Sequence, residues 1–220
     1  MRVTVLKEQP RWIRLYHFTH IDHLVSIVRD GLVADTAAQR ARVLRHEAGD
    51  PAIKERRRRA RVPVGEGGVV ADYVPFYFAP RSPMLFRLFK GGVTTYDSDQ
   101  QDLVYLCSTV ERLEALGAAA VITDRNAAVR IADFSDDGAR WRVDGFVDWD
   151  LMGATWWNNT EQYPDRVERR MAECLVHKRV PWEAILAVGT IDDQRAASVR
   201  QILGSAVDPP KVIVRPEWYF

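Results

Sequence analysis

The sequence predicts an α+β fold, in which short strands alternate irregularly with short helices. Three observations favour this class. Short apolar runs recur along the chain, stripes of apolar residues at helical spacing separate several of them, and Gly or Pro marks most boundaries. No internal repeat or long linker divides the 220 residues, which suffice for one substantial core. We therefore expect a single domain over residues 1–220.

The first predicted elements are a strand and a helix. Leu15 to Phe18 is typical of a strand, and Thr19 predicts the start of a helix that Gly31 ends. The apolar stripe of this helix consists of Ile21, Leu24, Val25 and Val28. Residues 36–61 are rich in Ala and Arg, so a helix there has few large apolar residues to bury.

The middle of the chain carries clear signals for a strand and a capped helix. The apolar run Tyr73 to Phe78 predicts a strand. Ser82 followed by Pro83 supplies an N-cap and a first-turn proline, and Gly91 predicts the end of the helix.

The remaining elements follow the same alternation. Asp102 to Cys107 predicts a strand, and Ser108 with Glu111 predicts a capping box for a helix that ends at Gly117. Further strands are predicted at Ala119 to Thr123, Glu173 to His177, Ala184 to Thr190 and Val212 to Arg215, with a helix at Asp192 to Leu203. The polar segment 124–170 instead holds Trp141, Trp149, Trp156 and Trp157, which predicts partly exposed indoles.

The composition places the chain among ordinary globular proteins. At 47% hydrophobic and 28% charged residues it excludes disorder, collagen and coiled coil. No apolar stretch is long enough for a bilayer, and the N-terminus lacks a signal-peptide layout. Cys107 and Cys174 are too few for a disulfide framework. We expect a cytoplasmic protein with no membrane partner.

Positive charge is concentrated in one segment. The whole chain carries a net charge of +1, but residues 40–61 hold nine Lys or Arg against three acidic residues. Such a cluster attracts polyanions and favours salt-dependent binding of nucleic acid. A solvated helix face explains the charge equally well.

The common catalytic and cofactor motifs are absent from the sequence. It contains no GxGxxG, GxxxxGK[ST] or GxSxG, and neither cysteine has an evident setting that would lower its pKa. His17, His20 and His23 have a spacing that invites a metal interpretation. Because His17 lies on the predicted strand and the others on the following turn and helix, they need not converge, and we predict no metal site.

Glu173 stands out at the start of its predicted strand. It shares a face with Leu175 and His177, while Ala172 and Cys174 lie on the other face. A carboxylate in this position can serve chemistry. The more common alternative is an edge-strand glutamate in water.

Five blocks of sequence, in order along nearly the whole chain, resemble one family. They are Leu15 to Asp22, Asp72 to Leu85, Thr123 to Ala127, Ala172 to Val176 with Pro181-Trp182, and Trp218-Tyr219. The chain resembles the DarT family, the DNA ADP-ribosyltransferase toxins paired with the DarG macrodomain antitoxin. The block from Tyr73 to Leu85 is the most specific of these matches.

The resemblance implies a mono-ADP-ribosyltransferase fold, a split mixed β-sheet with an NAD cleft between its halves. It implies transfer of ADP-ribose from NAD to thymine in single-stranded DNA, within a short sequence motif and without a metal. The expected partners are single-stranded DNA and a DarG-like macrodomain antitoxin, and we expect a monomer. Alternatives are transfer to guanine, RNA or protein, and an inactive nucleic-acid-binding module on the same fold.

The resemblance also implies roles for individual residues. Glu173 and Arg57 match the family's catalytic glutamate and arginine, although four consecutive arginines allow the second match to shift by one residue. The residues that would bind NAD are His17, Phe18, Thr19, Ser26, Ala34, Arg57, Tyr77 and Met84.

DNA binding fits two segments. Single strands are held by cationic grooves together with aromatic platforms. The residues that would contact DNA are Arg40, Arg42, Lys54, Arg56, Trp156, Trp157 and Asn158. For Trp156 a role as an anchor in the core is an equally good interpretation.

Overall fold

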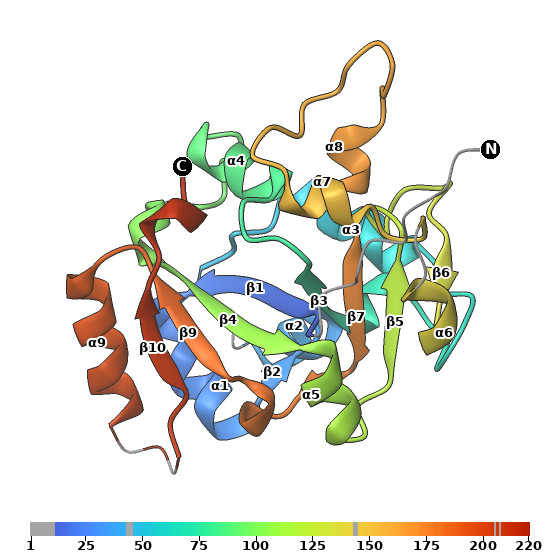
Figure 1. The fold of residues 1–220 in the computed structure, drawn as a ribbon. Helices are drawn as coiled ribbons and strands as arrows, with labels where there is room; N and C mark the ends of the chain where they lie inside the picture. The colour runs from blue at the N-terminus through green and yellow to red at the C-terminus, as the bar shows by residue number, and fades with distance from the viewer. Residues whose placement is uncertain (1–11, 43–45, 143–144, 205, 207) are drawn as a thin grey trace.

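The computed structural model, in which residues 12–42, 46–142, 145–204, 206 and 208–220 are described, has an eight-stranded sheet at its centre (Figure 1). The strand order is β10-β9-β4-β1-β3-β7-β5-β6, and all neighbours are antiparallel except β9 and β10. The strands are β1 (Arg14–His20), β3 (Tyr73–Tyr77), β4 (Leu103–Thr109), β5 (Ala120–Thr123), β6 (Phe134–Ser135), β7 (Glu173–His177), β9 (Ala187–Thr190) and β10 (Lys211–Val214). β2 (Leu32–Val33) and β8 (Arg179–Val180) form a separate pair.

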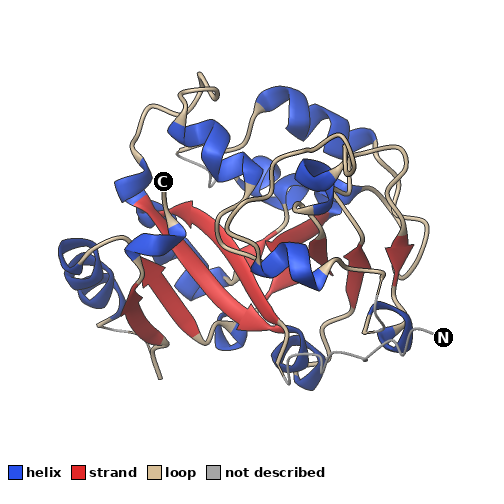
Figure 2. Ribbon diagram, turned by 45° about the horizontal axis from the view of Figure 1, so that its top comes forward, coloured by secondary structure: helices blue, strands red, loops and turns tan. Residues whose placement is uncertain are grey.

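Short helices surround this mixed sheet, so the predicted α+β class is confirmed (Figure 2). They are α1 (Leu24–Asp30), α2 (Asp35–Ala41), α3 (Pro51–Arg59), α4 (Pro83–Phe89), α5 (Val110–Ala115), α6 (Gly138–Trp141), α7 (Trp149–Gly153), α8 (Arg166–Arg169) and α9 (Asp193–Leu203). Figure 1 shows α4, α7 and α8 along one rim of the sheet and α9 beside β10.

The sheet is joined at its middle by a single residue pair. β1 and β3 meet only at Tyr16 and Tyr77, whereas β1 pairs with β4 along its whole length and β3 pairs with β7 in the same way. Beyond that pair β1 and β3 separate, and His17 Nδ1 bridges the opening to the carbonyl of Pro75 at 2.8 Å. The sheet is therefore split into two halves, as the family resemblance implied.

Two clusters of buried apolar side chains hold the sheet together. Phe76 and Leu106 belong to a large apolar cluster that crosses the sheet, while Tyr105 and Tyr219 pack in a second cluster beneath β1 and β4. Burying each such side chain contributes roughly 1.5–3 kcal/mol to folding. These contacts fix the two walls between which the strands separate.

Most predicted elements form, but several boundaries differ. Ser82 caps α4 as predicted, because its Oγ accepts the Leu85 N–H at 3.2 Å. The prediction of a helix start at Thr19 is wrong. β1 continues through His20, whose ring accepts the Asp22 N–H and so starts a 3₁₀ turn before α1.

The predicted capping box at Ser108 is also wrong. β4 runs two residues beyond Cys107, so Thr109 is the N-cap and accepts the Arg112 N–H at 3.1 Å. Ser108 instead donates to the Ala184 carbonyl at 2.7 Å. Residues Trp182–Ala184 form a 3₁₀ turn, so the strand predicted from Ala184 begins only at β9.

None of the helices in the described part of the chain has the length and apolar character that crossing a membrane requires.

We expect Gly189→Ala to destabilise the fold by about 1–3 kcal/mol, the usual cost of overpacking a core. A Cβ at Gly189 would lie 2.5 Å from Trp218 Cζ3 and 3.3 Å from Tyr105 Cβ. Urea unfolding measures the change. The control is Gly153→Ala, because a Cβ there meets nothing within 4 Å and should be neutral or slightly stabilising. Equal midpoints for the two variants would contradict the packing of Trp218 on β9.

Candidate active site

A cleft of about 700 Å³ opens where β1 and β3 separate. Its walls come from β1, α1, α2, α3, β3 and α4, elements that lie far apart in the sequence. The predicted NAD-binding residues that line it are His17, Phe18, Thr19, Ser26, Arg57, Tyr77 and Met84. Ala34 is buried between the lining residues Val33 and Asp35 and does not itself line the cleft. The structure thus brings together residues from most of the predicted set.

Arg57 and Glu173 form a buried ion pair beside this cleft. Arg57 Nη1 donates to Glu173 Oε1 at 2.8 Å and to Oε2 at 3.0 Å. Glu173 is 0% exposed and lies on β7, between β3 and β5. Thr123 Oγ1 accepts the Glu173 N–H at 3.0 Å, which fixes the start of the strand. The alternative of an edge-strand glutamate in water is therefore wrong.

Arg57 separates the carboxylate from the cleft. Arg57 lines the cleft whereas Glu173 does not. Of the four consecutive arginines, Arg58 and Arg59 form ion pairs with Glu55 on their own helix, and Arg56 is exposed. The helical spacing of α3 therefore turns one arginine of the run toward Glu173, and that residue is Arg57.

The ion pair keeps the arginine charged. Burial alone would lower the pKa of Arg57, but the charge and hydrogen bonds of Glu173 raise it above its ordinary value. Burial raises the pKa of the Glu173 carboxyl, and Arg57 opposes that shift. Tyr77 lies directly across from Glu173 in the β3–β7 register, and burial followed by this neighbouring carboxylate raises the pKa of its phenol. The raised pKa keeps the phenol neutral, and its hydroxyl donates to Met84 Sδ at 3.6 Å.

His17 presents a neutral imidazole to the cleft. Burial lowers the pKa of His17 to about 4. A neutral ring whose Nδ1 donates to the Pro75 carbonyl leaves Nε2 as a hydrogen-bond acceptor. Thr19 Oγ1 lies 2.9 Å from His23 Nδ1, and Ser26 Oγ donates to the His23 carbonyl at 2.8 Å. These contacts fix the polar groups along the β1 wall.

His17, His20 and His23 do not form one group of possible ligands among the described residues, as expected from their places on different elements. His20 instead lies close to Asp22 and His46, and sequence spacing did not indicate His46. The possible ligand atoms of these three lie within 4.8 Å of one another. The His20 and His46 rings are stacked, with centroids 3.8 Å apart and planes 24° from parallel. Nitrogen lone pairs lie in the ring planes, so those of stacked rings do not point at one shared position. This arrangement does not fit a metal ion.

Comparison with known proteins identifies the chain. Residues 16–220 match the model of a family described as "ssDNA thymidine ADP-ribosyltransferase, DarT". The chain belongs to the DarT family. Its activity is therefore ADP-ribosylation of thymidine in single-stranded DNA, and both the predicted family and the predicted acceptor are confirmed.

Individual DarT proteins match over almost their whole length. A DNA ADP-ribosyl transferase of Thermus sp. (strain 2.9) is 35% identical over 212 residues, which cover 94% of this chain and 95% of the relative. Solved structures of Thermus sp. 2.9 DarT, in complex with ADP-ribosylated ssDNA and with NAD+, superpose with TM-scores of 0.88 and 0.80. At 32% identity they cover 98% and 97% of this chain and 100% of the Thermus chain.

A third match is a longer protein. It is the DNA ADP-ribosyl transferase-DNA ADP-ribosyl glycohydrolase fusion protein of Thermosipho africanus, 25% identical over 211 residues. The match covers 96% of this chain and 50% of the fusion protein.

The DarT chain carries a projecting loop, residues 154–165, between α7 and α8, which is the orange loop at the top of Figure 1. Trp156 on this loop is 78% exposed, and Asn158 is also exposed. Trp157 is only 9% exposed, and its ring packs edge-on against that of Phe86, with the ring centroids 6.1 Å apart. The predicted contact of Trp157 with DNA is not supported, because its buried ring anchors the loop.

The basic segment of this DarT protein is only partly available to a polyanion. Arg40, Arg42 and Arg56 are exposed, and Arg56 also lines the cleft. Lys54 is 13% exposed and pairs with Asp35 at 2.6 Å and with Glu47. Because these two carboxylates already neutralise it, the predicted phosphate contact of Lys54 is not supported. Arg45 lies outside the described residues.

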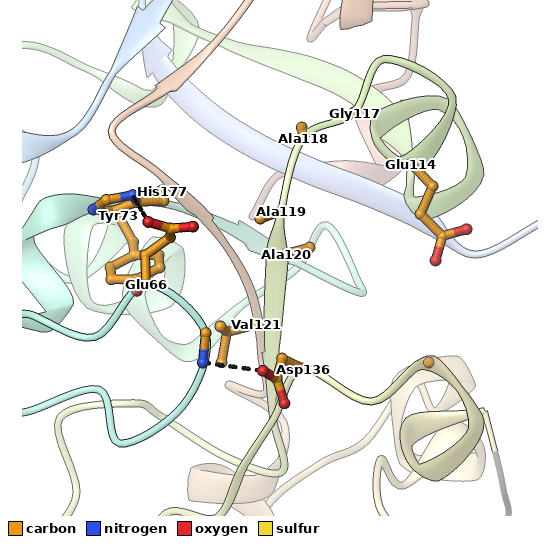
Figure 3. Close-up of a pocket in the computed structure, with 12 residues that line it drawn as sticks. Glu66, Tyr73, Glu114, Gly117, Ala118, Ala119, Ala120, Val121, Asp136 and His177 are labelled. Atoms are coloured by element: carbon orange, nitrogen blue, oxygen red, sulfur yellow. Dashed lines mark hydrogen bonds and ion pairs between the residues drawn. The ribbon is translucent and has the colours of Figure 1, made fainter.

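A second hollow, of about 420 Å³, lies at the other end of β7 (Figure 3). Glu66 lies 3.9 Å from His177 there, and Asp136 accepts the Gly65 N–H at 3.0 Å. The lining includes these carboxylates, His177, Tyr73 and the short side chains of Ala118 to Ala120, but neither Arg57 nor Glu173. The cleft, rather than this hollow, is the candidate active site.

The two cysteines of the chain are unsuited to nucleophilic chemistry. Cys107 and Cys174 are free thiols, and burial raises the pKa of both, that of Cys107 to about 12. They therefore remain protonated at neutral pH. This agrees with the prediction that neither is a nucleophile.

We expect His17 and His23 to stay neutral from pH 8 down to about pH 5. Burial lowers the pKa of both imidazoles from the ordinary 6.5 to about 4, and for His23 the neighbouring His20 adds to the effect. NMR titration of the ring protons, assigned with His17→Gln and His23→Gln, measures this directly. A midpoint near 6.5 for either ring would contradict it.

The same shifts make stability depend on pH. Between about pH 6.5 and 4 the unfolded chain binds two protons that the folded chain does not. Folding stability due to these two groups is therefore complete above pH 6.5 and falls as the pH drops toward 4.

Proposed function

We propose that the cleft binds NAD and that Glu173 and Arg57 promote transfer of its ADP-ribose to thymine in single-stranded DNA. The observation that carries this proposal is the buried ion pair of Arg57 and Glu173 beside a cleft of dinucleotide size. The Thermus relative solved in complex with NAD+ supports the choice of donor. We treat residues 1–220 as one catalytic domain.

One unpartnered polar atom beside the cleft suits a phosphorylated dinucleotide. Arg57 Nη2 is buried and has no hydrogen-bond partner among the described residues, although Nη1 holds both oxygens of Glu173. A buried donor without an acceptor is costly, so a ligand oxygen that accepts this N–H is favoured. We assign His17 and Thr19 to the nicotinamide ribose and amide, and Tyr77 with Met84 to the nicotinamide ring.

Glu173 acts on the charge that develops during cleavage. Breaking the glycosidic bond of NAD generates an oxocarbenium-like ribose, and a carboxylate that accepts a ribose hydroxyl stabilises this positive charge. Because Arg57 lies between Glu173 and the cleft, its side chain must shift before a ribose hydroxyl can reach the carboxylate. Nicotinamide leaves with the bonding electrons, and C1 of the ribose accepts the thymine nitrogen.

Arg57 supplies charge rather than a base. Its guanidinium is protonated at any ordinary pH, and pairing with Glu173 strengthens that preference. A thymine ring nitrogen is a poor nucleophile until its proton leaves, and in this reaction the proton passes to solvent water as the nitrogen bonds to C1 of the ribose. We therefore assign to Arg57 the stabilisation of the thymine anion and of the NAD phosphates.

Single-stranded DNA reaches the cleft along the exposed residues of the loop and of the basic segment. Trp156 provides a stacking platform, with Asn158 beside it, and Arg40, Arg42 and Arg56 provide phosphate contacts. The Thermus relative in complex with ADP-ribosylated ssDNA supports this class of acceptor. We further propose that the protein is a cytoplasmic monomer whose partner is a DarG-type glycohydrolase, as the Thermosipho fusion protein suggests.

We expect Glu173→Gln to reduce transfer to DNA by roughly 100- to 1,000-fold, the usual effect of removing one electrostatic contact to a transition state. The amide still accepts one hydrogen bond from Arg57, so the fold and most of the NAD affinity should remain. Mass spectrometry of a modified oligonucleotide gives the rate, and calorimetry gives the NAD affinity.

Glu55→Gln is the matched control, because Glu55 lies on α3 and pairs only with the exposed Arg58 and Arg59 among the described residues. It should keep transfer within about threefold of wild type, well under the effect of a lost transition-state contact. Undiminished transfer by Glu173→Gln would remove Glu173 from the mechanism.

We also expect single-stranded DNA to be modified at least about 100-fold faster than the same sequence annealed to its complement. In a duplex the thymine ring nitrogen is both hydrogen-bonded and stacked, and extruding the base costs about 3 kcal/mol. Incubation of both forms with NAD, followed by mapping of the adduct, tests this. Equal rates would indicate active base flipping, and an adduct on guanine would favour the alternative acceptor.

A further inference from the structure

A buried arginine lies at the base of the projecting loop. Arg170 is 4% exposed and directly follows α8. Its Nη1 donates to the carbonyls of Leu151 at 2.6 Å, Met152 at 2.9 Å and Ala154 at 3.3 Å. These are carbonyls at the C-terminal end of α7, which a cation stabilises because the helix dipole is negative there. Arg170 thus closes the helix from which the loop departs.

The same guanidinium reaches a second wall of the site. Arg170 Nη2 donates to the Arg81 carbonyl at 3.3 Å, in the turn between β3 and α4. Met84, on the first turn of α4, lines the cleft. Three residues beyond Arg170 the chain reaches Glu173. One side chain therefore ties together the start of the loop, the α4 wall and the segment that carries the buried carboxylate.

Arg170 makes these contacts without an acidic partner among the described residues. Burial, followed by the charge of Arg81, lowers the pKa of Arg170 to about 10. Its Nε is buried and unpartnered in the described part of the chain. The desolvated cation is compensated only by backbone carbonyls, so its stability depends on all three segments being in place.

The far end of the loop is held in a similar way. Arg166 Nη2 donates to the Trp156 carbonyl at 2.8 Å, and Asn159 Oδ1 accepts the Val167 N–H at 2.8 Å. The loop is therefore held by hydrogen bonds to α8 and to Arg170, the residue after this helix. Trp156 nevertheless keeps an exposed ring, which is the arrangement that a rigid stacking platform requires.

We infer that Arg170 is a positioning residue for the DNA acceptor: it holds the loop at residues 154–165 and the start of α4 at a fixed separation from Glu173. It touches neither NAD nor the base. It acts by presenting Trp156 in one orientation, so that thymine is delivered to the same place in each turnover. This inference rests on the proposed function of the loop as a DNA contact.

Steady-state kinetics of Arg170→Met and Arg170→Lys test the inference. Methionine fills a similar volume but leaves the carbonyls without a donor, whereas lysine keeps the charge and loses the planar fork. For Arg170→Met we expect the KM for the oligonucleotide to rise about tenfold or more, the effect of losing hydrogen bonds from a charged group. The KM and Kd for NAD should stay unchanged, and Arg170→Lys should recover part of the loss.

Hydrogen exchange provides a readout that does not depend on activity. In both variants, faster exchange is expected at residues 151–160 and 81–85, with β7 and β9 unchanged. The control is Arg195→Lys. Arg195 lies on α9, pairs with Asp102 at 2.6 Å and does not line the cleft. It should leave both the kinetics and the exchange at the loop as in wild type.

The outcomes separate the inference from the proposed function. Parallel rises in the KM values for NAD and DNA, or faster exchange spread over the whole sheet, would show a merely structural role and overturn the inference. An unchanged oligonucleotide KM with unchanged exchange would also overturn it. If wild type fails to modify DNA, the proposed function fails, while exchange at the loop still decides whether Arg170 anchors it. If Arg170→Met does not fold, the Arg170→Lys variant carries the test.

Discussion

The contact between Arg57 and Glu173 determines where the outer wall of the cleft lies. α3 has no fully buried residue, so apolar packing contributes little to its position. Charged contacts hold it instead: Arg57 reaches Glu173 in the sheet, Lys54 reaches Asp35 on α2, and the capping residue Asp50 accepts Arg87 of α4 at 2.6 Å. The position of α3 therefore depends on ion pairs, and the Arg57–Glu173 pair is the one that connects this helix to the central sheet.

This mode of attachment gives the wall a direct link to ligand binding. A buried ion pair is strongly destabilised when one partner is removed, but it loses little when a new partner replaces the old one. A ligand with phosphates and ribose hydroxyls offers such replacements to Arg57 and Glu173 together. In the proposed function, the groups that hold α3 against the sheet are also the groups that bind the substrate. Occupation of the cleft and the position of its wall would then be coupled through the same atoms.

The sequence predicted what depends on local patterns and on family motifs. Ser82 as a cap and the β7 strand at Glu173 were both predicted, because each is encoded within a few residues. The helix start at Thr19 was misplaced because β1 gains two more pairs with β4, at Thr19 and His20, and these long-range contacts are not contained in local propensity. The burial of Trp157 and the pairing of Lys54 depend on α4 and α2, so neither could be predicted from its own neighbourhood.

Strand register explains how the Glu173 carboxylate is both buried and placed to meet Arg57. Tyr77 lies opposite Glu173 on β3, and the same Tyr77 makes the single pair that joins β3 to β1. A slip of one residue between β3 and β7 would turn Glu173 to the other face and away from Arg57. Thr123 on β5 opposes such a slip from the other side, through its hydrogen bond to the Glu173 N–H. The core strands therefore fix the position of Glu173, whereas Arg57 holds the flanking helix α3 and Arg170 holds the start of the loop at residues 154–165.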